Sequence, residues 1–116
     1  KKTTGDKELP MGGIIVRTAF LEQNPAAVEK FLEEYKASTE YTATNLAETA
    51  ALTEKYDIMK ADVAQKAIPN CNIVYLDGAA MKESVKGFFD ILLKADAKSI
   101  GGKLPDDALY YEKAGN

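Results

Sequence analysis

The feature that most constrains the fold of this chain is the order of a glycine loop, a strand and a capped helix within residues 9–41. The consecutive β-branched residues Ile14–Val16 favour extended backbone, and they are apolar on both faces. The Pro- and Gly-containing segment Pro10–Gly13 precedes them as a loop. Asn24 is a typical helix cap, and Pro25 suits the first helical position because its missing N–H costs nothing there. This order predicts an α/β domain whose strand is buried on both sides.

Two further helices are expected in the middle of the chain. The second helix starts at Asn45, where Glu48 three residues later resembles a capping box, and it continues to about Tyr56. A short third helix is expected around residues 61–68, because Pro69 cannot continue it.

The last part of the chain adds a second strand and the longest helix. Ile73–Leu76 is the strand candidate, and Asp77-Gly78 turns the chain into the helix. The apolar stripe of this helix is expected to be core, and it consists of Met81, Val85, Phe88, Phe89 and Leu92.

The predicted fold class is therefore α/β and helix-rich, with about four helices and two short strands. Since two strands alone are marginal in water, the sheet is expected to be completed by residues outside this sequence. Residues 1–116 are read as a single domain or a fragment, with residues 1–8 and 112–116 flexible.

Composition argues against several classes of function. The 116 residues carry a net charge of −3 without a basic stripe, so no nucleic-acid partner is expected. No apolar run approaches the roughly 20 residues that span a bilayer. The absence of histidine removes the commonest general base and most zinc sites, so neither an enzyme nor a cofactor or metal is expected. Cys71, the single cysteine, is expected to be a small buried hydrophobe.

The candidate ligand-binding residues lie in two loops. Gly12 and Gly13, beside Pro10 and Met11, would let a ligand approach the backbone closely, although a turn that enters the strand also explains them. A second set of small polar groups, Asn70 and Asn72, precedes the second strand, where ordinary turn chemistry is the alternative reading.

Three motifs near the end have plainer readings. Gly101-Gly102-Lys103 lacks the spacing of a phosphate loop and reads as a helix terminus. Asp106-Asp107 could favour a metal, but a solvated turn is the simpler interpretation. Tyr110-Tyr111 could stack on a ligand, cover a neighbouring surface or form an exposed tail.

A set of motifs between Leu9 and Tyr111 carries a family resemblance. The set consists of Arg17 at the strand end, Phe20, the cap Gln23-Asn24-Pro25, FLEEYK (31–36), AIPNCNIVYLDG (67–78) and SIGGKLPDDALYY (99–111). In this combination the chain resembles the C-terminal portion of ABC-transporter solute-binding proteins with the type II periplasmic-binding fold. The similar members bind nitrate, sulfonates, taurine or thiamine pyrimidine precursors.

The resemblance implies the solute-binding component of an ABC importer, which captures a small molecule between two lobes and delivers it to a permease. Such a protein is extracellular and lipid-anchored, or periplasmic in a Gram-negative cell. Its anchor would be the only link to the membrane, and copies of the chain could exchange segments to form a homo-oligomer. The resemblance places Pro10–Gly13 near the hinge, where the family presents backbone to the ligand, and leaves Asn70 and Asn72 as weaker candidates. The alternatives are a pyrimidine-precursor enzyme of thiamine biosynthesis with the same fold, and a small helical interaction module.

Overall fold

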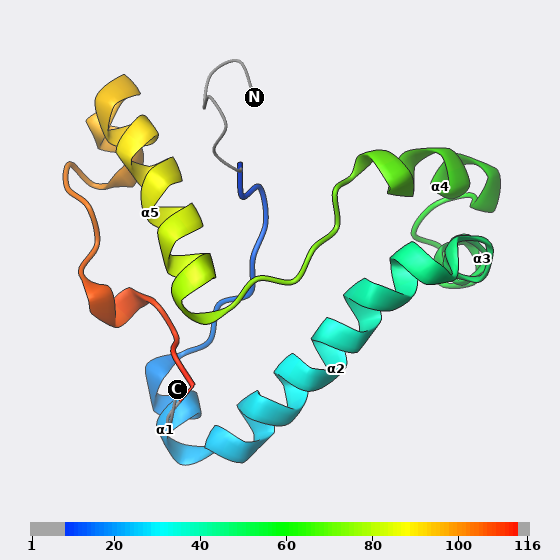
Figure 1. Cartoon of the computed structure of the whole chain (residues 1–116), viewed down its shortest axis with the longest axis horizontal. Coiled ribbons are helices and arrows are strands. Elements are labelled where there is room, and N and C mark those ends of the chain that lie inside the picture. Colours follow the sequence, from blue (N-terminus) through cyan, green and yellow to red (C-terminus); the bar gives the residue numbers. More distant parts are fainter. Residues whose placement is uncertain (1–8, 114–116) are drawn as a thin grey trace. The chain divides into compact units, whose positions relative to one another are not determined.

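The computed structural model describes residues 9–113, which form five α-helices and three short 3-10 helices (Figure 1). About 68% of these residues are helical, and no strand occurs among them. The chain divides into two compact units, residues 17–75 and residues 1–16 together with 76–116. Residues 1–8 and 112–116 are predicted to be flexible, and of these the structure describes only Glu112 and Lys113.

The unit of residues 17–75 is a series of helices joined by short breaks. They are α1 (Thr18–Gln23), α2 (Pro25–Thr44), α3 (Leu46–Lys55), α4 (Ala61–Ala67) and the 3-10 turn η1 (Ile68–Asn70). Helix α3 packs against α4, and α2 contacts α1 and α3 at its two ends. The three helices expected here from the sequence are confirmed, and α1 is an addition to them.

Asn24 separates α1 from α2 by closing the first helix rather than capping the second. Its backbone N–H donates to the carbonyl oxygen of Phe20 at 2.8 Å, and its side-chain amide donates to the same oxygen at 3.3 Å. No side-chain cap joins Asn24 to α2, which begins with Pro25 at its first turn. The predicted helix start is therefore correct, but the predicted capping role of the Asn24 side chain is wrong.

Asn45 separates α2 from α3 in the same way, by closing the preceding helix. The Asn45 backbone N–H donates to the Tyr41 carbonyl oxygen at 2.9 Å, and its side chain makes no cap on α3. Glu48 accepts a hydrogen bond from the Tyr41 hydroxyl instead of completing a capping box. This hydrogen bond to a carboxylate raises the pKa of Tyr41. Tyr41 thus ties the end of α2 to the first turn of α3.

The interior of this unit is built from small side chains. Ala50 on α3 and Ala64 on α4 are 0% exposed, and Val28 and Thr39 on α2 are also buried. Alanine at both positions allows two helices to approach closely without leaving a cavity. The Thr39 hydroxyl donates to the Lys36 carbonyl oxygen at 2.7 Å, so its burial leaves no unpaired polar group.

The second unit contains one long helix, α5 (Gly78–Ala95), followed by the 3-10 turns η2 (Ala97–Ile100) and η3 (Asp107–Leu109). Gly101 closes η2 in the left-handed region with φ 75°, which glycine adopts without a steric cost. The Gly102 N–H then donates to the Ala97 carbonyl oxygen at 2.8 Å. The reading of Gly101-Gly102 as a helix terminus is confirmed. After it, the chain returns alongside α5, where η3 pairs with that helix.

The two predicted strands are wrong, and with them the α/β fold class. Ile14–Val16 and Ile73–Leu76 lie outside the helices, but neither belongs to a ladder among the described residues. β-Branched residues favour extended backbone, yet a strand exists only when a neighbouring strand takes up its N–H and C=O groups. Ile15 is 97% exposed, so the expected burial on both faces is also absent.

Two expectations about burial are also corrected. The α5 stripe that contains Met81, Phe88 and Leu92 is half-buried rather than core. Cys71 is exposed, and its thiol lies 3.3 Å from the Ala67 carbonyl oxygen. Within residues 9–113, no helix combines the length and apolar character needed to cross a membrane.

The contact between α3 and α4 predicts a size limit at Ala50. Ala50→Leu should lower the free energy of unfolding by about 1–3 kcal/mol, because a fully buried site has no room for three more carbon atoms. Chemical denaturation measures this change. The matched control is Ala51→Leu, an exposed position on the same helix, which should stay within about 0.5 kcal/mol of the parent. Equal losses in both variants would contradict close packing at Ala50.

Candidate functional site

The predicted glycine loop, Pro10–Gly13, has neither helical nor strand structure and is open to solvent. Met11 is 83% exposed. Apart from each glycine and its two chain neighbours, no atom of the described part lies within 4 Å of the positions where Cβ atoms would sit on Gly12 and Gly13. Neither glycine has a positive φ, so neither is required by the backbone conformation. The loop therefore presents bare backbone that a ligand could approach closely.

The second predicted pair, Asn70 and Asn72, has local structural roles. The Asn70 side-chain amide donates to the Lys66 carbonyl oxygen at 2.9 Å, which closes the end of α4 and η1. Asn72 adopts a left-handed φ of 50°, a conformation that asparagine tolerates in turns. Both residues belong to the unit of residues 17–75, whereas Pro10–Gly13 belongs to the other unit. Neither unit by itself brings the two predicted sets together.

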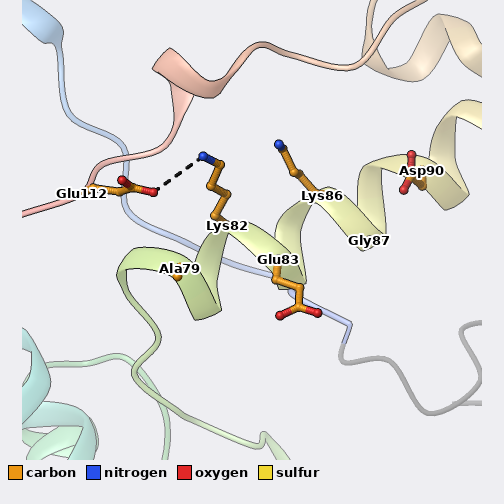
Figure 2. A pocket seen from close by; sticks show the side chains of 7 residues that line it. All are labelled: Ala79, Lys82, Glu83, Lys86, Gly87, Asp90 and Glu112. Carbon is orange, nitrogen blue, oxygen red and sulfur yellow. Dashed lines mark ion pairs between the residues drawn. The ribbon is translucent and has the colours of Figure 1, made fainter. Parts of the chain in front are cut away.

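A charged cluster that the sequence reading missed lies on α5. Lys82 and Lys86 are four residues apart, and the carboxylate of Asp107 bridges them. The Lys86 Nζ lies 2.7 Å from Asp107 Oδ1, and the Lys82 Nζ lies 3.1 Å from Asp107 Oδ2. Glu112 adds a longer ion pair, 3.6 Å from Lys82 (Figure 2).

The ring of Tyr110 supports the two ammonium groups. The Lys82 and Lys86 Nζ atoms lie 6.0 and 5.8 Å from the ring centroid, within the range of a cation–π interaction. Tyr110 is 8% exposed, and its hydroxyl is buried without a hydrogen-bond partner among the described residues. The predicted role of Tyr110 as a cover for a neighbouring surface is the alternative that agrees with this burial.

An open hollow of about 470 Å³ lies beside this cluster on α5 (Figure 2). Carboxylates of Glu83, Asp90 and Glu112 line it together with the two lysines. Acidic groups thus outnumber basic ones around the hollow. It can admit a small molecule, but it does not concentrate positive charge.

The ion pairs shift the pKa values of their members in opposite directions. Hydrogen bonds from Lys86 and then Lys82 hold the pKa of Asp107 below its ordinary value of 3.8. The hydrogen bond to Asp107 raises the pKa of Lys82 above 10.5. Both shifts mean that the folded chain favours the charged forms.

The neighbouring Asp106 pairs with a backbone N–H group and not with a lysine. Its carboxylate accepts a hydrogen bond from the Ala108 N–H at 3.0 Å and so caps η3. No group of three or more metal-binding side chains occurs within residues 9–113. The prediction of a solvated turn describes Asp106, but it missed the pairing of Asp107.

The spacing of Lys82 and Lys86 places the two lysines on one helix face, and the sequence shows this directly. Nothing local in the sequence indicates that Lys86 has a partner 21 residues away.

Comparisons with family models, curated proteins and solved structures find no match to this chain.

The lowered pKa of Asp107 predicts how its contact with α5 depends on pH. Because the folded-state pKa lies below the unfolded value, the contact contributes fully above pH 3.8 and is lost as the pH falls through the lowered pKa. An NMR titration of the Asp107 side-chain carbonyl carbon should give a midpoint below 3.8. The double substitution Lys82→Gln and Lys86→Gln should return the midpoint toward 3.8, and an unchanged midpoint would contradict the two ion pairs.

Proposed function

We propose that this chain is part of the solute-binding component of an ABC importer, which captures a small molecule and delivers it to a permease. The observation that carries the proposal is the open backbone of Pro10–Gly13, where two glycines offer N–H and C=O groups without side chains around them. Because neither glycine has a positive φ, the backbone conformation does not explain why glycine stands at these positions. Close approach of a ligand to the backbone would explain it.

Further support comes from the motifs of the family resemblance and from where they lie. The QNP segment spans the junction of α1 and α2, FLEEYK lies within α2, and the SIGGKLPDDALYY segment begins inside η2 and contains η3. These three motifs thus coincide with helices or junctions between helices, whereas most of AIPNCNIVYLDG (67–78) lies in the non-helical segment between η1 and α5. The printed sequence also has no histidine, which agrees better with binding than with acid–base catalysis.

In this proposal the solute contacts the backbone of the glycine loop and stabilises one arrangement of a two-lobed protein. A ligand can shift such an equilibrium only by its difference in affinity for the two arrangements. The permease is the macromolecular partner, and the component works outside the membrane, held by a lipid anchor. The chain supplies the C-terminal portion of that component.

A second candidate, a small helical interaction module, is favoured by the exposure of large apolar side chains. Ile15, Ile58 and Val74 are each more than 60% exposed, and no large side chain of the described part is fully buried. A contiguous apolar patch is typical of a contact with another protein, and this candidate requires that exposed residues such as these gather in one. A second copy of the chain is the simplest such partner.

A thermal-shift screen tests the solute-binding proposal with the full-length protein that contains this chain. The panel consists of sulfonates, nitrate, aromatic acids and pyrimidines. One class should raise the melting temperature, since a ligand at a hundredfold its Kd stabilises by about 2.7 kcal/mol. Gly13→Leu should weaken that ligand at least about tenfold by blocking the backbone, which corresponds to 1.4 kcal/mol.

Ala51→Leu is the control for that experiment, because it also introduces a leucine, at an exposed position on α3. It should leave the Kd unchanged. The proposal is wrong if no compound of the panel stabilises the protein, and the role of the loop is wrong if Gly13→Leu binds as well as the parent.

Sedimentation velocity over a range of concentrations tests the interaction module. Self-association is expected, and Ile15→Lys should weaken it because a charge would replace a fully exposed apolar contact residue. Gln65→Lys, at an exposed position on α4, is the matched control and should associate like the parent. A chain that stays monomeric throughout would contradict this candidate.

A further inference from the structure

We propose that the ammonium groups of Lys82 and Lys86 form a binding site for a small, singly charged carboxylate, and that Asp107 occupies this site until a free carboxylate displaces it. The site lies on α5 and uses none of the residues of the glycine loop. The inference therefore goes beyond the proposed function and does not depend on it.

The geometry around Asp107 is already that of carboxylate recognition. Each of its two oxygens is held by a different ammonium group, at 2.7 Å from Lys86 and 3.1 Å from Lys82. Hydrogen bonds between ionised partners at such distances are the strong ones. A free carboxylate that takes the place of Asp107 would find both donors at the same spacing.

Tyr110 keeps the two donors in position. Its buried ring lies beneath both ammonium groups, and the Lys82 side chain is only 24% exposed. A side chain that is already held in place loses little further freedom when it binds a ligand. The donors are therefore arranged in advance by packing and not by Asp107 alone.

Asp107 itself is placed so that it can leave. Its side chain is 66% exposed, and it lies on the three-residue turn η3. The open hollow next to the cluster has room for a small molecule. Glu112, at 3.6 Å from Lys82, would keep one partial neutralising contact after Asp107 has moved away.

The charges that face the hollow select the ligand class. Glu83, Asp90 and Glu112 line it, so a ligand with two or more negative charges would meet repulsion from three carboxylates. A singly charged carboxylate replaces Asp107 without adding to the net charge at the two lysines. The site should therefore prefer acetate or propionate to phosphate or sulfate.

Occupation by Asp107 should mask the site in the parent protein. A group tethered by a short segment competes at an effective concentration on the order of millimolar, so a free carboxylate binds with a reduced apparent affinity. Asp107→Asn removes the competing charge while it keeps the size of the side chain. The apparent Kd for acetate should then fall by the factor by which Asp107 competes for the two lysines in the parent.

The experiment is an NMR titration of the full chain with sodium acetate, followed at the lysine side-chain Nζ and Hε signals, with sodium chloride at equal ionic strength as the reference. Asp90→Asn is the matched control, because it removes one negative charge from the same hollow without releasing either lysine. It should lower the apparent Kd far less than Asp107→Asn does, because it removes only general repulsion. Adding Lys86→Gln to Asp107→Asn should abolish the gain.

Two results would overturn the proposal. One is an apparent Kd for Asp107→Asn equal to that of the parent, and the other is an equal gain in Asp90→Asn, which would indicate general electrostatics. If Asp107→Asn changes the Tyr110 ring signals, the variant has altered the packing, and the test is then made on the parent protein. Acetate, unlike chloride, should then shift the Asp107 carboxyl carbon signal at constant pH, and an unmoved signal would refute displacement.

Discussion

The structure depends on the fact that an α-helix satisfies its own backbone hydrogen bonds, whereas a strand needs a neighbour. Helices α2 and α5 form along segments whose donors and acceptors are paired within the segment. Ile14–Val16 and Ile73–Leu76 have the composition of strands but no ladder partner among the described residues. The same constraint explains why the helices are where the sequence predicts them and why the expected sheet is absent.

Burial in the two units comes from a few well-placed contacts rather than from a large core. In one unit, Ala50 and Ala64 lie in helices that pack together, and their small size makes close approach feasible. In the other, Tyr110 is buried beneath Lys82 and Lys86, whose charges are neutralised by Asp107. The lysine stems and ring supply apolar contact, while the ion pairs hold the returning segment on α5.

Local sequence chemistry predicted some features of this arrangement and misjudged others. Pro25 and Gly101 mark a helix start and a helix end correctly, because each acts through its own backbone conformation. The capping roles of Asn24 and Asn45 were wrong, since their backbone and side-chain groups satisfy the preceding helix or its last residue instead. The open geometry of Pro10–Gly13 agrees with the predicted loop, while Asn70 and Asn72 have turn roles.

The sequence by itself determined where helices α2 to α5 lie, although not α1, because propensity, proline and glycine act within one turn of the residue concerned. Only the tertiary structure decided which charges meet. Lys86 and Asp107 are 21 residues apart, and their contact requires the turns at η2 and η3 to bring the chain back along α5. It also decided that Ile15 and Cys71 are exposed, because burial depends on what packs against a residue and not on the residue alone.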